Sequence, residues 1–121
     1  MISESLRPTE IRVRKAEKTL EINFTDQSAF IYTAEYLRVE SPSAEVQGHG
    51  HGQKTLIFGR RHVGIATVEP VGNYAIRIVF DDLHDTGIFS WQYLYRLGIE
   101  KEERWNKYLT AIKKAGLSRD P

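Results

Sequence analysis

The sequence predicts an α+β fold: a single small domain over residues 1–121, built mainly from an antiparallel sheet, with two short helices and a C-terminal amphipathic helix. Three observations predict it. Apolar and polar residues alternate over residues 11–24 and again over 65–80, as in half-buried strands. Residues 22–38 resemble residues 78–96, and an apolar stripe with helical spacing runs through residues 100–116. A chain of 121 residues is long enough to bury a hydrophobic core of its own.

The two similar segments each predict a strand, an aspartate turn, a second strand and a capped helix. The matching residues are Ile22 with Ile78, Phe24 with Phe80, Asp26 with Asp82, Thr33 with Ser90, and Tyr36-Leu37 with Tyr93-Leu94. Thr33 and Ser90 are expected to cap the helices, because a hydroxyl can accept a hydrogen bond from the first helical turn. Gly98 is expected to end the second helix in a left-handed conformation. The sequence therefore predicts a strand-turn-strand-helix pseudo-repeat.

The remaining elements follow from local signals. Residues 63–69 and 74–80 flank a short turn and predict a hairpin. One face of its second strand is expected to hold Tyr74, Ile76, Ile78 and Phe80. Residues 54–58 predict a short strand, and residues 41–53 a loop, because of Pro42 and three glycines. The apolar stripe of the last helix consists of Trp105, Tyr108, Leu109 and Ile112. We expect this stripe to pack on a sheet.

The composition excludes several classes of protein. The 17 basic and 16 acidic side chains give a formal net charge of +1, without the basic excess of nucleic-acid-binding proteins. No apolar run approaches the roughly 20 residues of a membrane span, and residues 1–10 lack the features of a signal peptide. The absence of cysteine removes disulfides and thiolate metal sites, and it fits a reducing cytoplasm. We therefore expect a cytoplasmic protein that binds neither nucleic acid nor membranes.

The segment GHGHG, residues 48–52, is the least ordinary part of the chain. His49 and His51 alternate with three glycines, and imidazole is the commonest metal ligand near neutral pH. A transition-metal site needs three or four ligands. The spacing does not select the others among His62, Asp82, His84 and Asp85. The simpler interpretation is a surface loop with solvated histidines, and a backbone nest for an anion is a further alternative.

No complete catalytic arrangement is visible in the sequence. Asp85-Thr86-Gly87 matches the aspartic-protease triplet, but those enzymes need a second carboxylate, and the other repeat lacks the triplet. Lys54-Thr55 follows glutamine and not glycine, which argues against a P-loop. His84 has an adjacent aspartate, but the sequence has no nucleophile elbow and no thiol. We therefore predict that this chain is not an enzyme.

Two longer segments carry a family resemblance: LRVESPSAEVQGHG, residues 37–50, and VEPVGNYAIRIVFDDLHDTGIFSWQYLYRLG, residues 68–98. Together they resemble a small bacterial domain family that is similar to the N-terminal domain of gamma-butyrobetaine hydroxylase. The resemblance covers about residues 8–98 and leaves residues 99–116 as a separate C-terminal helix. In the hydroxylases a 2-oxoglutarate- and iron-dependent oxygenase domain follows, but its His-x-Asp motif does not occur in this sequence. The resemblance therefore implies no hydroxylase activity for this chain.

The resemblance also implies where a site would lie. The hydroxylase domain binds zinc through three cysteines, at positions that correspond to Ser41, Ser43 and Val46, and through a histidine that corresponds to His84. Since the thiols are replaced, a thiolate zinc site is ruled out. What the resemblance leaves open is a histidine-based iron or zinc site that combines His84 with residues of the glycine–histidine segment. The predicted metal ligands are His49, His51 and His84.

The resemblance further implies a binding surface and a partner. The predicted surface residues are Ser41, Ser43, Gly48, Gly50, Gly52 and Trp91, although the position of Trp91 before a helix is also typical of core. Related domains occur joined to P-loop ATPases of the iron–sulfur carrier type. We therefore predict a non-catalytic accessory or binding module that acts through a protein partner, of iron–sulfur carrier or oxygenase type. The alternative is a metal-ion-binding protein.

Overall fold

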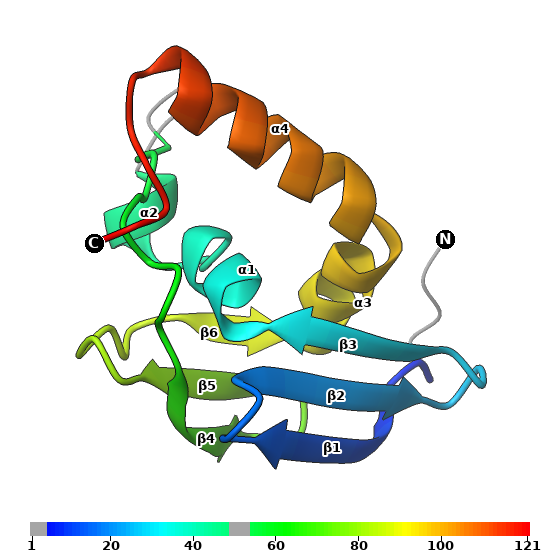
Figure 1. Ribbon diagram of the computed structural model, residues 1–121. Coiled ribbons are helices and arrows are strands. Elements are labelled where there is room, and N and C mark those ends of the chain that lie inside the picture. Colours follow the sequence, from blue (N-terminus) through cyan, green and yellow to red (C-terminus); the bar gives the residue numbers. More distant parts are fainter. Residues whose placement is uncertain (1–4, 49–53) are drawn as a thin grey trace.

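The computed structural model describes residues 5–48 and 54–121, and it confirms the α+β fold. The first sheet holds β1 (Pro8–Arg14), β2 (Thr19–Phe24) and β3 (Ala29–Thr33), and helix α1 (Ala34–Val39) follows it. The second sheet holds β4 (Ile65–Val71), β5 (Ala75–Phe80) and β6 (Ile88–Ser90), and helix α3 (Trp91–Ile99) follows it. Helices α2 (Ala44–Gln47) and α4 (Lys101–Lys114) complete the described elements. In Figure 1 the helices gather beyond β3 and β6, and β1 and β4 lie farthest from them.

The alternating apolar residues set the inner face of each antiparallel sheet, as predicted. In β2 the buried residues are Leu20, Ile22 and Phe24, and in β5 they include Ile76, Ile78 and Phe80. Together with residues of α1 and α3 they form one continuous core. The hairpin of β4 and β5 is confirmed, but Tyr74 lies in its turn with an exposed side chain. The prediction that Tyr74 shares the buried face is wrong, because β5 begins one residue later.

The predicted pseudo-repeat is confirmed, including both helix caps. Thr33 Oγ1 accepts a hydrogen bond from the Tyr36 N–H at 3.1 Å, and Ser90 Oγ accepts one from the Tyr93 N–H at 3.1 Å. Each cap satisfies an N–H group that has no partner inside its helix. Strand, turn, strand and capped helix therefore occur twice along the chain.

The helices of the two units bind each other through matching tyrosines. Tyr36 of α1 donates its hydroxyl to the Leu97 carbonyl of α3 at 2.7 Å. Tyr93 of α3 donates to the carbonyl of Glu40, directly after α1, at 2.5 Å. Because these tyrosines occupy equivalent places in the repeat, the two bonds are reciprocal and hold the ends of α1 and α3 together.

Gly98 does not have the predicted role. It lies inside α3, which continues to Ile99, and it is absent from the glycines with positive φ. A Cβ atom at this position would lie 2.4–2.7 Å from ring atoms of Phe30 on β3. The glycine therefore allows α3 to approach the first sheet closely.

Helix α4 carries the predicted apolar stripe, but the expected packing on a sheet is wrong. Tyr108 and Ile112 are buried against Val39, with Leu56 and Ile57 beside them. The helix thus covers the end of α1 and the segment after residue 53, as Figure 1 shows. Gly116, with φ 71°, follows the helix in the left-handed conformation typical of a C-terminal glycine.

Two further predictions about the middle of the chain are wrong. Residues 54–58 form no strand, and residues 44–47 of the expected loop form helix α2. The C-terminal residues hold the segment after residue 54 in place: the N–H groups of Gly59 and Arg61 donate to the carbonyls of Ser118 and Arg119, each at 2.9 Å. Arg119 in turn donates two hydrogen bonds to the buried carboxylate of Glu35, at 2.9 and 2.7 Å.

Candidate functional site

The structure brings Ser41, Ser43 and His84 together at one corner of the fold. The Oγ atoms of Ser41 and Ser43 lie 3.0 and 3.2 Å from Nε2 of His84. Both serines are buried, and their loop follows α1, whereas His84 lies in the turn between β5 and β6. We call these three residues the serine–histidine corner. It joins the first structural unit to the second.

The close approach at this corner explains a glycine that sequence patterns associate with catalysis. A Cβ atom at Gly87 would lie 2.5 Å from Ser41 Oγ and 3.1 Å from the Phe89 ring. Thr86, the residue before it, donates a hydrogen bond to Glu45 of α2 at 2.7 Å. The Asp-Thr-Gly triplet therefore packs the turn against the serine loop.

An ion cluster lies next to the corner. Asp82 Oδ2 accepts hydrogen bonds from Nε of Arg38 and from Nε of Arg60, both at 2.8 Å, and Oδ1 accepts the His84 N–H at 3.1 Å. Burial raises the pKa of Asp82, but the hydrogen bonds from Arg38 and His84 and the two guanidinium charges outweigh it, so the pKa is lowered. Nη1 of Arg38 is buried without a hydrogen-bond partner in the described part of the chain. Two guanidinium groups thus share one carboxylate.

The same surroundings act on His84. Burial lowers the pKa of the His84 imidazole, and the positive charge of Arg38 lowers it further. The carboxylates of Glu45, Asp82 and Asp85 act in the opposite direction, but the net shift is downward. His84 is therefore held in its neutral form as a hydrogen-bonding partner of the serines at neutral pH.

The turn that carries His84 has a structural twin in the first unit. In both turns an aspartate Oδ1 accepts the N–H two residues later, from Ser28 at 2.9 Å in the first and from His84 at 3.1 Å in the second. The middle residue has a positive φ in both, 76° for Gln27 and 74° for Leu83. Gln27 is polar, whereas Leu83 is an apolar side chain that is 89% exposed. The second turn thus presents a leucine directly to solvent.

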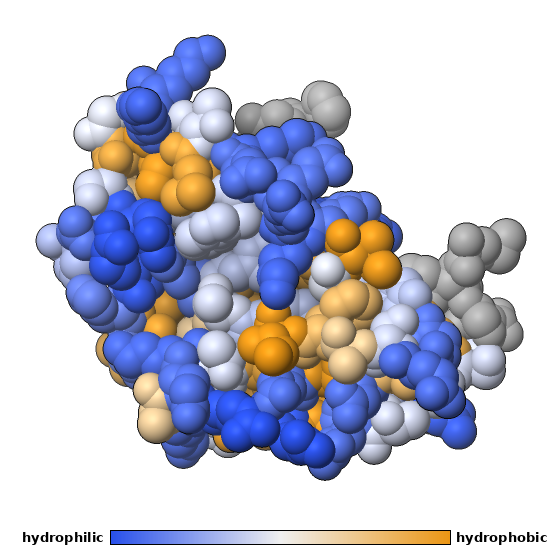
Figure 2. Space-filling model, turned by 45° about the vertical axis from the view of Figure 1, so that its right-hand side comes forward, coloured by the Kyte–Doolittle hydropathy of each residue, from blue (hydrophilic) through white to orange (hydrophobic). Residues whose placement is uncertain are grey.

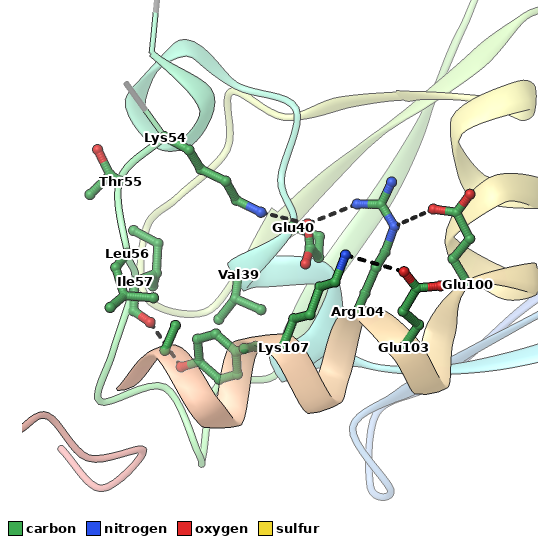
Figure 3. A pocket seen from close by; sticks show the side chains of 12 residues that line it. Val39, Glu40, Lys54, Thr55, Leu56, Ile57, Glu100, Glu103, Arg104 and Lys107 are labelled. Atoms are coloured by element: carbon green, nitrogen blue, oxygen red, sulfur yellow. Dashed lines mark hydrogen bonds and ion pairs between the residues drawn. The ribbon is translucent and has the colours of Figure 1, made fainter. Parts of the chain in front are cut away.

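A cleft of about 440 Å³ lies beside the corner, between α4 and residues 54–57. Glu40, the residue before Ser41, lies at the floor of this cleft. The Glu40 side chain is only 6% exposed. Figure 3 shows Lys54 and Arg104 reaching Glu40 from opposite sides. Both donate to Oε1, Lys54 Nζ at 2.8 Å and Arg104 Nη1 at 3.1 Å, and Arg104 Nε also donates to Glu100 at 2.8 Å. The cleft is therefore lined by linked charges of both signs.

Only some of the predicted site residues lie at the serine–histidine corner. Ser41, Ser43 and His84 meet at the corner, and Gly48 ends α2 with φ 76°. His49, Gly50, His51 and Gly52 lie outside the described residues. Trp91 lies elsewhere: its indole donates to the Asn73 carbonyl at 2.8 Å, and it lines a separate hollow with residues 7–11.

The described residues do not fit a thiolate metal site. Hydroxyl groups of Ser41 and Ser43 occupy two of the positions, and the third, Val46, is a buried apolar side chain. Within residues 5–48 and 54–121, no group of three or more His, Cys, Asp or Glu side chains is arranged to hold a metal ion. The predicted set of His49, His51 and His84 includes two residues outside the described part, and it remains a prediction.

Sequence reasoning missed Leu83, Glu40 and Arg104 as residues of interest. For Leu83 a signal was present, since the alignment of the two repeats places this leucine opposite Gln27 in a predicted turn. For Glu40 and Arg104 the sequence offers no signal, because residues 64 positions apart meet only through the packing of α4.

Comparison with known proteins identifies the fold family. The family model described as gamma-butyrobetaine hydroxylase-like, N-terminal, matches residues 11–95. The chain belongs to this family. The resemblance predicted from the two longer segments is thereby confirmed. The matching model describes an N-terminal domain and not the catalytic domain of a hydroxylase.

Solved structures similar to this family member agree with its fold. Two are each described as an NMR solution structure of the protein, with 47% and 42% sequence identity and a TM-score of 0.82 for both. The first match covers 94% of this chain and 90% of that chain, and the second covers 100% and 92%. A crystal structure of a protein of unknown function from Acidithiobacillus ferrooxidans, of the DUF971 family, is 38% identical with a TM-score of 0.64. That match covers 75% of this chain and 91% of the other.

No protein with a curated description matches this family member. None of the helices in the described ranges is both long enough and apolar enough to span a membrane.

Proposed function

We propose that this chain is a non-catalytic binding module that acts through a protein partner, and that the turn carrying Leu83 is the contact point. The observation that carries the proposal is a leucine with φ 74° whose side chain is 89% exposed. A left-handed conformation costs a non-glycine residue roughly 1–2 kcal/mol. Exposing a large apolar side chain gives the isolated protein no compensating stability. Such a combination is typical of a residue whose favourable contacts form only in a complex.

The surroundings of Leu83 are arranged to hold the turn still. The preceding residue, Asp82, is fixed by two arginines, and the following one, His84, is fixed by Ser41 and Ser43. A turn whose backbone is already held in one place loses little backbone conformational entropy when a partner binds. The buried hydroxyls of the serine–histidine corner cannot themselves contact a partner. The corner therefore acts indirectly, by fixing the residue next to Leu83.

The chemistry around Leu83 indicates what kind of partner surface fits. Phe58, which is 49% exposed, lies near the same ion cluster, because its carbonyl accepts a hydrogen bond from Arg60 at 3.0 Å. The charges around the turn are of both signs: Arg38 and Arg60 share the carboxylate of Asp82, and the carboxylates of Glu45 and Asp85 also act on His84. We infer a partner with an apolar hollow for Leu83.

The burial of Ser41 supports a non-catalytic role. A serine hydroxyl that is hydrogen-bonded to a histidine resembles the nucleophile and general base of some enzymes. Ser41 has no exposed surface, however, and the closely packed Gly87 leaves no room beside its Oγ. A substrate cannot reach this hydroxyl in the folded protein, which favours a structural role for the pair.

The resemblance and the composition suggest where to look for the partner. Iron–sulfur carriers and oxygenases are the classes that the resemblance associates with such domains. We propose the cytoplasm as the compartment, because a chain without cysteine has no disulfide that would need an oxidising environment.

The experiment compares proteins retained from a cell lysate by the wild-type chain and by Leu83→Gln, which copies the twin turn. We expect the substitution to abolish retention of a specific partner. The matched controls are Ile31→Gln and Ile99→Gln. Each replaces an exposed apolar residue outside this turn with glutamine, and each variant should retain the partner. Sedimentation of the purified protein tests whether the partner is a second copy of this chain.

Two results would contradict the proposal. One is a partner that binds Leu83→Gln as tightly as the wild type. The other is a partner that is lost equally with the two isoleucine variants, since binding would then not depend on this turn.

A further inference from the structure

We propose that Glu35 and Trp105 form a binding site for an arginine side chain. Arg119 fills this site in the structure, and an arginine of a partner segment can take its place. The site borders a hollow of about 450 Å³. On the face shown in Figure 2, hydrophobic surface occurs in separate patches bordered by hydrophilic surface, and single polar side chains are suited to recognition on such a surface. The inference goes beyond the Leu83 turn and uses other residues.

The geometry around Glu35 matches a planar guanidinium group. Nε and Nη2 of Arg119 donate to the two carboxylate oxygens of Glu35, at 2.9 and 2.7 Å. The Cζ atom of Arg119 lies 5.2 Å from the centre of the Trp105 ring. A guanidinium group provides a planar fork for both oxygens and a flat face for the ring, whereas an ammonium group provides neither. The site therefore selects arginine over lysine.

The charges that line the hollow also select a cation once Arg119 is withdrawn. Among the described residues of the lining, the only other cation is Lys101, whose ammonium donates to the Ile31 carbonyl at 2.8 Å. The carboxylates of the lining are those of Glu35 and Glu102. The Glu35 side chain is only 6% exposed, and a buried charge that loses its partner is strongly destabilising. Withdrawal of Arg119 thus leaves a buried anion that requires another cation.

The rest of the tail segment, residues 117–120, makes contacts that another extended segment can reproduce. The carbonyls of Ser118 and Arg119 accept N–H groups of the segment that precedes β4, each at 2.9 Å. These bonds use backbone atoms, so they do not depend on the identity of the side chains. Leu117 adds an apolar contact with the cluster around Tyr108. We therefore infer a partner segment with an aliphatic residue two positions before an arginine.

Gly116 gives the tail segment a hinge. It has a φ of 71° and is exposed, and apart from its chain neighbours a Cβ atom there would meet no atom within 4 Å. The outer ion pair of the tail segment joins Asp120 and Arg61, whose side chains are 63% and 40% exposed, and pairs of this kind contribute little. Release of the tail segment therefore costs mainly the contacts of Arg119 and Leu117, which the partner segment restores.

Ethylguanidinium is a suitable probe, because it supplies the atoms that Arg119→Ala removes. The probe is added to the ¹⁵N-labelled full chain of this variant, and the signals of the Trp105 indole N–H and the Glu35 amide are followed. We expect saturable shifts of both signals toward their wild-type positions. Ethylammonium, which lacks the planar fork, and ethylurea, which lacks the charge, should bind at least about tenfold more weakly. The wild type, whose site is filled, should not respond.

Matched variants separate this site from general charge effects. Adding Glu35→Gln to Arg119→Ala removes the buried carboxylate and should abolish the response to ethylguanidinium. Adding Glu17→Gln instead removes the same charge from an exposed turn and should leave binding unchanged. If Arg119→Ala is partly unfolded, the same order of the three probes is measured as the rise that each causes in the thermal midpoint.

A peptide with the sequence of residues 116–121 tests whether an arginine from another chain fills the site. It is added to the variant Leu117→Ser/Arg119→Ser, in which the tail segment has lost both anchoring side chains. We expect saturable shifts at the amides of Gly59 and Arg61. A peptide with lysine in place of the arginine should bind at least about tenfold more weakly. The wild type should bind the arginine peptide more weakly than the variant does, because its own tail segment competes.

Two results would overturn the proposal. One is ethylammonium binding to Arg119→Ala as tightly as ethylguanidinium. The other is an arginine peptide that leaves the amides of the Leu117→Ser/Arg119→Ser variant unshifted. Leu83→Gln should change neither measurement, so failure of the proposal for the Leu83 turn would leave the arginine site unaffected.

Discussion

At the scale of single residues, the twin turns allow a direct comparison of two side chains on the same backbone. Gln27 and Leu83 have φ values within a few degrees of each other, and the hydrogen bonds around them correspond. We expect Leu83→Gly to stabilise the fold by about 1 kcal/mol, because glycine adopts positive φ without the steric cost. Urea unfolding measures the change, and Gln27→Gly is the matched control with a similar expected gain.

The outcome of that comparison has a clear meaning for function. If Leu83→Gly is stabilising and also abolishes partner retention, the leucine is kept at the expense of stability. If Leu83→Gly is destabilising while Gln27→Gly is stabilising, Leu83 contributes to the fold of the isolated protein and the proposed contact loses its support.

His84 makes the stability of the protein depend on pH. Its folded-state pKa lies below the unfolded value of 6.5, so the unfolded chain binds a proton more readily as the pH falls. The stability that neutral His84 contributes is therefore fully present above pH 6.5 and is lost as the pH falls through the folded pKa. We expect the wild type to lose more free energy of unfolding than His84→Gln between about pH 7 and 5.

Both proteins contain the other histidines, so the contribution of those histidines to the pH dependence of stability cancels in the comparison with His84→Gln. The lowered pKa values of Glu45 and Asp82 act at more acidic pH, since carboxyl groups titrate below this window. Equal losses for the two proteins, measured by urea unfolding at each pH, would contradict a neutral, buried His84.

At the scale of elements, the approach of α3 to β3 depends on a missing side chain. Gly98→Ala should gain helix propensity of up to about 1 kcal/mol. The new methyl group would lie within 3 Å of the Phe30 ring, and such overpacking typically costs 1–3 kcal/mol. We expect a net loss of about 1 kcal/mol in thermal or urea unfolding.

A second background tests whether Phe30 is the cause. In a Phe30→Leu protein, the flat ring is removed, so Gly98→Ala should become neutral or stabilising, and the two substitutions should couple strongly. The same loss in both backgrounds would show that the backbone at Gly98, and not the ring, limits the substitution.

The elements differ in how far the sequence could predict them. Strands, turns and capped helices follow from local patterns, and both repeats were predicted because the patterns occur twice. The local pattern predicts a helix end at Gly98, since a glycine after apolar residues is a normal stop signal, whereas its real constraint comes from Phe30, far away in the chain. The surface beneath α4 could not be predicted for the same reason: an apolar stripe shows that a helix packs, but not on which element.

At the scale of the whole molecule, the candidate site arises where the two repeated units meet. Ser41 and Ser43 follow the helix of the first unit, and His84 lies in the turn of the second. Their expected proximity came from the family resemblance, since residues 41 positions apart carry no local signal. The reciprocal bonds of Tyr36 and Tyr93 join α1 to α3, and the Tyr93 bond ends at Glu40, the residue between the corner and the cleft.

The metal hypothesis also concerns this junction, because it would link His84 to the segment between the two units. It predicts that zinc, iron(II) or nickel added at neutral pH shifts the ring signals of His49, His51 and His84 together in an NMR titration. His62, which is exposed, serves as the internal control. Metal binding to the folded state alone would also raise the thermal midpoint, and the variant His49→Ala/His51→Ala should lose both effects.

The hydrogen bonds at the corner make this a demanding test. Nε2 of His84 already lies within 3.2 Å of two serine hydroxyls, so a metal at this atom would have to displace both. Replacing the serines with alanine should then strengthen metal binding if Nε2 is the ligand, and leave it unchanged if Nδ1 is. Unshifted His84 signals with all three metals would leave the corner as a hydrogen-bonded support for the Leu83 turn.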